Sequence, residues 1–299
     1  KPTTMAPIRV AINGFGRIGR LVFRQLINRT DIELVAVNDL ADNTTLAHLL
    51  KYDSAHGRFE ADITVDNDHF NVNGKAVKGL AEPDPTKLPW KAMQVDVVLE
   101  CTGIFRSREK AGLHLTAGAK RVIISAPAKG DIKTVVLGVN AEILTSDDDI
   151  ISNASCTTNC LAPMVKVLHE NFGLQKAYAT TVHAYTADQN LQDAPHKKDL
   201  RRARAAAMNI VPTTTNAATA VELVYPAVEG RLNASAARVP VVDGSLTELT
   251  ALLENDATIE AINKVFKAAA EGPLKGIMAY TNEPLVSTDI VTDPHSVIF

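Results

Sequence analysis

Two cysteines stand close together in the stretch NASCTTNCLAP, at residues 153–163. The first, Cys156, lies among small hydroxyl residues, just before an apolar run with helical spacing that Gly173 is suited to end. The sequence therefore places Cys156 at or just before the start of a helix. Free backbone N–H groups and the helix dipole stabilise a thiolate there, and the thiolate is the form of cysteine that attacks carbonyl groups. Cys156 is a candidate nucleophile.

The second cysteine of this stretch, Cys160, lies one helical turn further along and is predicted to pack as a small buried hydrophobe. A disulfide between positions i and i+4 would be strained, and the total of 3 cysteines argues for reduced thiols. A nucleophilic cysteine needs a base, and of 8 histidines we single out His183, which follows a strand-like run in ATTVHAYTADQ. The sequence alone does not bring His183 near Cys156, and a histidine at a strand end is often an ordinary polar residue.

The N-terminal residues form a predicted βαβ unit. PIRVAING reads as a buried strand, GRLVFRQLINR as a helix and IELVAVND as a second strand. Between the first strand and the helix, NGFGRIGR fits G-x-G-x-x-G with Gly14, Gly16 and Gly19. The first glycine permits the tight turn, the second lets the backbone approach a pyrophosphate, and the third lets the helix pack on the strand. We also expect Arg17 and Ile18, at the predicted helix start, to contact the cofactor.

An acidic residue, Asp39, ends the second strand, where a carboxylate accepts hydrogen bonds from the ribose of a dinucleotide. Because a carboxylate repels a 2′-phosphate, Asp39 predicts NAD rather than NADP. The alternative is that the glycines only turn the chain and that Asp39 caps the next segment. Further strands are predicted at VDVVLECTG, RVIISAP and TVVLGVN. Strand C-terminal ends face the ligand in such sheets, so Thr102, Gly103 and Ser125 either lie near the cofactor or are ordinary turn residues.

The composition is typical of a soluble globular protein. The chain has 299 residues, of which 46% are hydrophobic, enough for one large or two ordinary domains. A formal net charge of -3 without a long basic block gives no reason to expect binding to nucleic acid or an anionic membrane. We find neither a run of about eighteen apolar residues nor a secretory pattern, so we expect a cytoplasmic protein. No cysteine or histidine spacing typical of a metal site occurs, and no metal is expected.

Several motifs together closely resemble the phosphorylating, bacterial-like type of glyceraldehyde-3-phosphate dehydrogenase: NGFGRIGR, SNASCTTNC, the HAYT of residues 183–186, DLRRARAAA and ARVP. The resemblance runs from about Ile8 to the last residue. It implies an α/β fold with a doubly wound parallel Rossmann sheet at residues 1–154, which binds NAD, and an α+β catalytic domain with a mixed or antiparallel sheet at 155–299. It also implies a homotetramer. The strand and long helix that follow DPHSVIF in the family are expected to be absent from the chain as written.

The resemblance implies a covalent mechanism. Cys156 corresponds to the nucleophile, and His183 to the residue that activates its thiol and later helps proton transfer. Attack of the thiolate on the aldehyde of glyceraldehyde 3-phosphate gives a thiohemiacetal, and hydride transfer to NAD leaves a thioester. Inorganic phosphate then attacks the thioester and releases 1,3-bisphosphoglycerate.

The same resemblance implies two anion sites. Hydroxyl groups and one backbone donor are expected at the attacking phosphate: Ser155, Thr157, Thr215 and Asn216. A hydroxyl and two arginines are expected at the substrate phosphate: Thr186, Arg202 and Arg238. Arginines suit this task because their planar donors bind oxyanions bidentately. Asn216 stands where the common form of the family has glycine, and we expect it to tolerate a left-handed backbone there.

Other interpretations stay open. A relative that oxidises erythrose 4-phosphate shares the glycines and SNASCTTNC but commonly lacks the threonine that Thr186 provides. A second alternative, from a different class, is a non-catalytic NAD-binding protein or a surface adhesin, although Cys156 and His183 are intact. A third is regulation by oxidation, since an exposed thiolate of low pKa is susceptible to peroxide.

Overall fold

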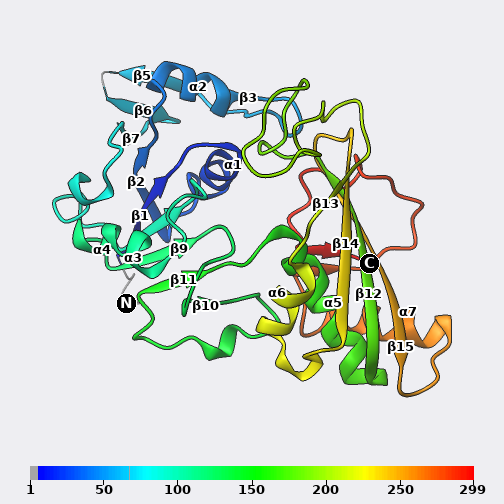
Figure 1. The fold of residues 1–299 in the computed structure, drawn as a ribbon. Coiled ribbons are helices and arrows are strands. Elements are labelled where there is room, and N and C mark those ends of the chain that lie inside the picture. Colours follow the sequence, from blue (N-terminus) through cyan, green and yellow to red (C-terminus); the bar gives the residue numbers. More distant parts are fainter. Residues whose placement is uncertain (1–5, 67) are drawn as a thin grey trace. The chain divides into compact units, whose positions relative to one another are not determined.

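The chain folds as two compact units (Figure 1), and the computed structural model describes residues 6–66 and 68–299. One unit comprises the N-terminal part of the chain up to Thr134, together with Glu142–Ala154. The other comprises Val135–Ala141 and Ser155–Phe299. The chain thus passes from one unit to the other at 154/155, where the sequence places the domain boundary. The segment Val135–Ala141 differs from that prediction, because it packs in the second unit.

The first unit is built, within the described residues, on a sheet of nine strands in the order β10-β11-β9-β8-β1-β2-β7-β6-β5. The strands are β1 (Ile8–Asn13), β2 (Ile32–Asn38), β5 (Ile63–Asp66), β6 (His69–Val72), β7 (Lys75–Leu80), β8 (Val97–Glu100), β9 (Arg121–Ile124), β10 (Lys133–Thr134) and β11 (Ile150–Ser152). Neighbours from β10 through β7 are parallel, which confirms the predicted α/β fold. The antiparallel extension β7-β6-β5 was not predicted.

The central strands of this sheet are buried on both faces. Val10 and Ile12 of β1 pack into one apolar cluster and Ala11 into another, because successive side chains of a strand point to opposite faces. This two-sided burial explains why the strand reads as a continuous apolar run rather than an alternating one. The other elements of this unit are α1 (Arg17–Leu26), α2 (Asn43–Lys51), α3 (Arg108–Ala111), α4 (Leu113–Thr116), the short strands β3 (Tyr52–Asp53) and β4 (Gly57–Arg58), and the 3₁₀ turn η1 (Pro85–Lys87). The 3₁₀ turn η2 (Ala141–Ile143) begins at the last residue of the segment that belongs to the second unit.

A buried polar network joins the C-terminal ends of β1 and β8. The Glu100 carboxylate accepts from Asn13 Nδ2 at 2.6 Å and from the Thr102 backbone N–H at 2.8 Å. Trp90 Nε1 donates to His114 Nδ1 at 3.1 Å, so His114 Nδ1 is the unprotonated nitrogen and Nε2 donates to Glu100 at 3.0 Å. A buried carboxylate is costly unless it is hydrogen-bonded, and this network meets that need. It also fixes the turns that follow both strands.

The second unit contains a four-stranded sheet in the order β13-β14-β12-β15. Its strands are β12 (Leu174–Ala184), β13 (Val211–Thr213), β14 (Leu232–Val239) and β15 (Leu246–Leu253), and the remaining elements are α5 (Cys156–Phe172), α6 (Ala217–Val224), η3 (Pro226–Val228), α7 (Ile259–Glu271), β16 (Met278–Ala279) and β17 (Val297–Ile298). β12 is parallel to β14 and antiparallel to β15, so the sheet is mixed, as predicted. Helix α5 packs against β12 and β15.

The predicted strand TVVLGVN is wrong beyond its first residue. The strand β10 ends at Thr134, and the next residues turn into the second unit, where Val135, Val136 and Val139 are buried. Asn140 Oδ1 accepts from the Val136 N–H at 2.8 Å, which closes this turn. The apolar run therefore marks burial in the second unit rather than a continued strand. Among the described residues, no helix has the length and apolar character needed to cross a membrane.

Candidate active site

Cys156 is the first residue of α5, where the sequence predicts the start of a helix. The preceding residue, Ser155, caps the helix, because its Oγ accepts from the Thr158 N–H at 3.2 Å. At the other end Gly173 adopts a left-handed backbone with φ 69°, a conformation that suits glycine. The side chain of Cys156 is exposed at the N-terminal end of the helix, beside backbone N–H groups that favour negative charge.

The structure brings His183 to Cys156. His183 lies at the end of β12, and its Nε2 is 3.4 Å from Cys156 Sγ. Its Nδ1 lies 2.6 Å from the backbone oxygen of Ala184, which can only accept a hydrogen. A hydrogen on Nδ1 leaves the lone pair of Nε2 facing the thiol, which is the tautomer that a base requires. The ring is buried, with 9% of its surface exposed, so its orientation is fixed by these contacts.

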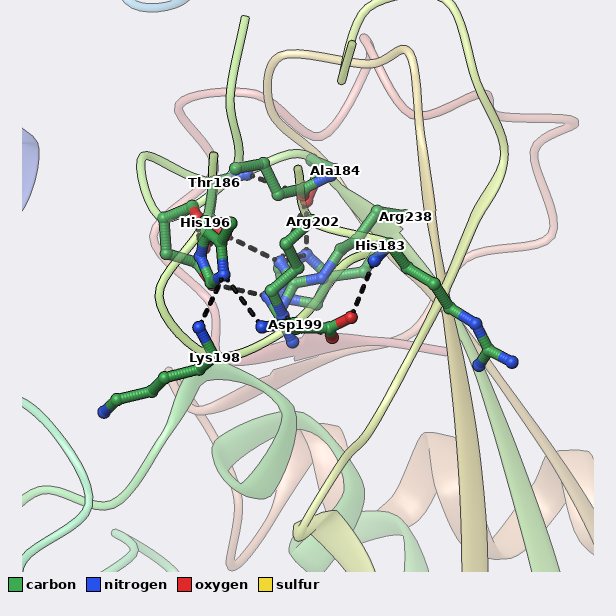
Figure 2. Close-up of polar contacts among 11 residues, drawn as sticks. His183, Ala184, Thr186, His196, Lys198, Asp199, Arg202 and Arg238 are labelled. Carbon is green, nitrogen blue, oxygen red and sulfur yellow. Dashed lines mark hydrogen bonds and ion pairs between the residues drawn. The ribbon is translucent and has the colours of Figure 1, made fainter. Parts of the chain in front are cut away.

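Arg238 lies opposite His183 in the register of β12 and β14. Its Nη1 is 2.8 Å from His183 Nδ1 and 3.2 Å from the Ala184 oxygen (Figure 2). Because arginine only donates, it bonds to the carbonyl oxygen when Nδ1 carries a hydrogen. The guanidinium therefore lies directly behind the imidazole, with the carbonyl of Ala184 shared between them.

The three cysteines differ in their tendency to ionise, and all are free. At Cys156, surrounding protein disfavours the charged form, but the hydrogen bond and charge of His183, with the hydroxyl and N–H of Thr157, lower the thiol pKa overall. Burial raises the pKa of Cys101 to about 11 and also raises that of Cys160. Cys160 packs beside the apolar cluster between α5 and α7, as predicted. Thiolate character is therefore concentrated at Cys156.

The three residues predicted to hold the substrate phosphate are linked in the structure. Arg238 Nη1 donates to Thr186 Oγ1 at 3.1 Å. The Thr186 hydroxyl in turn donates to Asp188, and the same carboxylate forms an ion pair with Arg202 Nη1. Although burial opposes ionisation, Thr186, Arg202 and Arg238 lower the pKa of Asp188. Arg238 Nε is buried without a hydrogen-bond partner among the described residues.

The four residues predicted at the attacking phosphate lie at two helix starts. Ser155 and Thr157 are at the start of α5, where Thr157 Oγ1 is 4.0 Å from Cys156 Sγ. Thr215 and Asn216 precede α6, which packs against α5. No hydrogen bond within the described part of the chain joins Thr215 or Asn216 to Cys156. The expected left-handed backbone at Asn216 is wrong, because its φ is -104° and any residue adopts that value.

The glycine motif in the first unit forms the turn from β1 into α1. Gly14 has φ 91°, and a Cβ on it would lie 2.7 Å from the Thr102 backbone nitrogen. A Cβ on Gly19 would lie 2.1 Å from the Gly14 oxygen, so only glycine allows the helix to approach the strand this closely. A Cβ on Gly16 would meet no atom within 4 Å, which leaves open space beside the backbone at the N-terminus of α1. These features fit a dinucleotide pyrophosphate.

Asp39 follows β2, and both of its carboxylate oxygens accept from backbone. Oδ2 accepts from Phe15 N–H at 2.7 Å and Oδ1 from Ala41 N–H at 3.1 Å. A carboxylate has about four acceptor positions, so capacity remains for ribose hydroxyls. Arg17, in the first turn of α1, forms an ion pair with Asp53, with Nη1 2.9 Å from Oδ2.

The remaining predicted cofactor contacts lie at the same C-terminal edge of the sheet. Ile18 is exposed in the first turn of α1, with 52% of its surface accessible. Thr102 follows β8 and bonds to the Glu100 carboxylate, while Ser125 follows β9 and its Oγ donates to the Glu100 backbone oxygen at 3.1 Å. Glu100 therefore holds both turns in place.

The sequence did not single out four groups that the structure places in the second unit's site: the Ala184 carbonyl, Asp188, His196 and Asp199. The sequence could have indicated Asp188 by its place in HAYTADQ, two residues after Thr186. It could also have indicated His196 and Asp199 by the length of the connection between β12 and β13, because long irregular loops are usually functional. Among the described residues, no group of three or more histidine, cysteine or acidic side chains could hold a metal ion.

Comparison with known families agrees with this geometry. The family model described as "Glyceraldehyde 3-phosphate dehydrogenase, NAD binding domain" matches residues 8–108, and "Glyceraldehyde 3-phosphate dehydrogenase, C-terminal domain" matches residues 155–299. The chain belongs to the glyceraldehyde-3-phosphate dehydrogenase family. The two matches fall in the first and second units respectively, as the resemblance of the motifs implies.

Curated members of the glyceraldehyde-3-phosphate dehydrogenase family from bacteria are similar over nearly the whole chain. The enzyme of Mycolicibacterium smegmatis is 57% identical over 300 residues, which cover 98% of this chain and 88% of that protein. That of Geobacillus stearothermophilus is 58% identical, covering 94% of this chain and 84% of that protein. That of Thermotoga maritima is 59% identical, covering 97% and 88%. Each carries the name glyceraldehyde-3-phosphate dehydrogenase.

Proposed function

We propose that the protein oxidises glyceraldehyde 3-phosphate to 1,3-bisphosphoglycerate, using NAD and inorganic phosphate. The observation that carries this proposal is the pair formed by Cys156 Sγ and His183 Nε2, 3.4 Å apart at a helix N-terminus, in a chain of this family. The lowered pKa of Cys156 supports the role of nucleophile, because the thiolate is the reactive form.

The proposed chemistry begins with attack of Cys156 Sγ on the aldehyde carbon. His183 Nε2 takes the thiol proton and returns it to the substrate oxygen, which becomes the hydroxyl of a thiohemiacetal. Bound NAD would supply the acceptor for the hydride of the thiohemiacetal carbon, which leaves Cys156 as a thioester. His183 takes the hydroxyl proton as the carbonyl forms again. A phosphate oxygen then attacks the thioester carbon, which releases the acyl phosphate and restores Cys156.

Two anion sites complete the proposed mechanism. Thr186, Arg202 and Arg238 hold the substrate phosphate, and the link between these residues supports this assignment. Hydroxyl groups and backbone donors at the starts of α5 and α6 bind the attacking phosphate, because helix N-termini favour anions. The residues assigned to this second anion are Ser155, Thr157, Thr215 and the backbone of Asn216.

The first unit would hold NAD by its glycine turn. The open space at Gly16 and the N–H groups at the start of α1 suit the pyrophosphate, and Asp39 suits a ribose diol. Arg17, Ile18, Thr102 and Ser125 surround this edge of the sheet. The negative charge of Asp39 disfavours a 2′-phosphate and hence NADP.

We further propose that the protein is a cytoplasmic homotetramer. One face of β12 and β15 carries exposed apolar side chains among polar ones such as Lys176 and Glu248: Tyr178, Val182, Leu246 and Leu252 point to this face and are 46%, 36%, 63% and 58% exposed. Exposed apolar side chains gathered on one face are typical of subunit contacts. Three free thiols suit a reducing compartment. Light scattering coupled to size-exclusion chromatography should give the mass of four chains, and a monomer would contradict the proposal.

The test follows NADH formation from glyceraldehyde 3-phosphate and NAD, with and without inorganic phosphate, in the wild type and in Cys156→Ser. We expect turnover that depends on phosphate and is lost in the variant. Turnover in Cys156→Ser equal to wild type would refute the mechanism and favour a non-catalytic role for the site. Erythrose 4-phosphate, tested in parallel, should be the poorer substrate, and the opposite ranking would favour the alternative dehydrogenase.

A further inference from the structure

The chain from 185 to 210 connects β12 to β13 without a helix or strand, and we call it the 185–210 loop. The loop folds back on itself by backbone hydrogen bonds. Asn190 N–H donates to the Arg202 oxygen at 3.1 Å, and Ala194 N–H donates to the Ala203 oxygen at 3.0 Å. Two segments far apart in the loop, around Asp188 and around Asp199, therefore lie beside Arg202.

Arg202 is held by a carboxylate from each of these segments. Its Nη1 pairs with Asp188, and its Nε lies 3.4 Å from Asp199 Oδ2. The arginine side chain is only 13% exposed, whereas that of Asp188 is 52% exposed. A long, flexible side chain is thus fixed at two of its nitrogens, and its position depends on where the two acidic segments lie relative to each other.

His196 ties the two acidic segments together (Figure 2). Its Nδ1 accepts from the backbone N–H groups of Lys198 and Asp199, at 3.2 and 3.0 Å. Its Nε2 lies 3.0 Å from the backbone oxygen of Asp188. A backbone N–H only donates and a carbonyl only accepts, so Nδ1 is unprotonated and Nε2 carries the hydrogen. One neutral tautomer satisfies all three contacts.

We propose that His196 is a positioning residue for Arg202, and through it for the phosphate of the substrate. The inference rests on the proposed function, in which Arg202 binds that phosphate. Within the described residues no hydrogen bond joins His196 to Arg202; His196 joins the backbone that carries Asp188 to the backbone that carries Asp199. Without this link the two carboxylates no longer hold the guanidinium between them in a fixed position. No hydrogen bond in the described part of the chain joins His196 to Cys156 or His183, so bond formation at Cys156 should not need it.

Three substitutions at His196 separate the hydrogen bonds made by Nδ1 from the one made by Nε2. Asparagine keeps an acceptor near Nδ1, because its side chain can accept from N–H groups two and three residues on, but it is too short to reach the Asp188 oxygen. Glutamine can place an amide N–H near the position of Nε2 but lacks the Nδ1 acceptor. Alanine removes both. His295→Ala serves as the matched control, since His295 lies in the same unit and its hydrogen bonds within the described residues go to Asp293, outside the 185–210 loop.

The measurement compares glyceraldehyde 3-phosphate with unphosphorylated glyceraldehyde as substrates. With three hydrogen bonds lost, we expect His196→Ala to raise the KM for the phosphorylated substrate about tenfold, and the Asn and Gln variants, which keep part of the link, about threefold each. The kcat at saturation, kcat/KM for glyceraldehyde and the affinity for NAD should stay at wild-type values. A general loss of structure would instead lower activity on both aldehydes alike, so this split distinguishes positioning from stability.

Two results would overturn the inference. One is an unchanged KM for glyceraldehyde 3-phosphate in the Asn and Gln variants, which also decides the question if His196→Ala fails to fold. The other is an equal loss of kcat/KM on both aldehydes. In either case an active wild type leaves the proposed function standing, whereas a wild type without phosphate-dependent turnover refutes the proposed function itself.

Discussion

Replacing His183 with asparagine should raise the pH at which Cys156 becomes reactive. In the structure His183 Nε2 lies 3.4 Å from Cys156 Sγ. Burial raises the pKa of the Cys156 thiol, and the hydrogen bond and charge of His183 make the largest contributions that lower it. Asparagine cannot carry a positive charge or take up the thiol proton. The thiolate then keeps only the support of Thr157 and the helix N-terminus.

The size of the effect follows from the hydrogen bond that is lost. A hydrogen bond to a charged group contributes about 1.5–3 kcal/mol, and one pKa unit corresponds to about 1.4 kcal/mol. The loss of this hydrogen bond should therefore raise the pKa of Cys156 in His183→Asn. The thiolate fraction below this pKa falls about tenfold per unit, but a thiolate of higher pKa is also the stronger nucleophile, so the rate falls by only about threefold per unit.

The assay is the rate of alkylation by iodoacetamide as a function of pH, without substrate or cofactor. Mass spectrometry identifies the modified cysteine, because Cys101 and Cys160 have raised pKa values and should react later. Thr157→Val serves as a control that removes a smaller contribution to the same thiolate. We expect the midpoint of the wild-type profile to lie lowest, that of Thr157→Val slightly higher, and that of His183→Asn highest.

An identical midpoint in the wild type and His183→Asn would refute the reasoning, because the thiolate would then owe nothing to the imidazole. Alkylation of Cys101 before Cys156 would refute it equally. A third contradictory result is a His183→Asn profile that stays below the wild type at high pH. Once both thiols are ionised, the variant should react at least as fast as the wild type.

Outcomes are also expected for five other variants. Ser155→Ala removes the N-cap of α5 and should lower the free energy of unfolding by about 1 kcal/mol in urea denaturation, and no change would deny the cap a role. Gly16→Ala should leave unfolding nearly unchanged but weaken NAD binding about tenfold by calorimetry, because it fills the space beside the pyrophosphate. Gly19→Ala should instead destabilise by about 1–3 kcal/mol, since its Cβ would lie 2.1 Å from a backbone oxygen, and equal behaviour of the two variants would contradict this distinction. Asp39→Asn should raise kcat/KM with NADP relative to NAD, whereas an unchanged ratio would show that charge does not decide the preference. Glu100→Gln should lower the free energy of unfolding by about 2–4 kcal/mol, because the amide NH₂ of glutamine would replace a carboxylate oxygen and face a buried N–H donor. A variant as stable as the wild type would show that this network is not needed.

The sequence predicted those parts of the fold that depend on local signals. The glycine turn, the helix that begins at Cys156 and the stop at Gly173 all follow from backbone preference, capping and periodicity, which act over a few residues. The apolar run after Lys133 shows the limit of such signals. Its valines are buried, as their type suggests, but burial alone does not tell a strand of the first unit from a turn in the second.

The sequence by itself determined which side chains are candidates for the chemistry and where the candidate nucleophile lies on its helix. Among 8 histidines, the strand-like run before His183 and the resemblance of motifs pointed to it, but its nearness to Cys156 depends on how β12 packs against α5. The ion pairs of Asp188 and Asp199 with Arg202, and the hydrogen bonds of His196 with the backbone of both acidic segments, were decided by the tertiary structure alone. Such contacts join segments distant in the chain, and no periodicity or cap encodes them, since they arise only when the 185–210 loop returns on itself and its donors and acceptors must be paired.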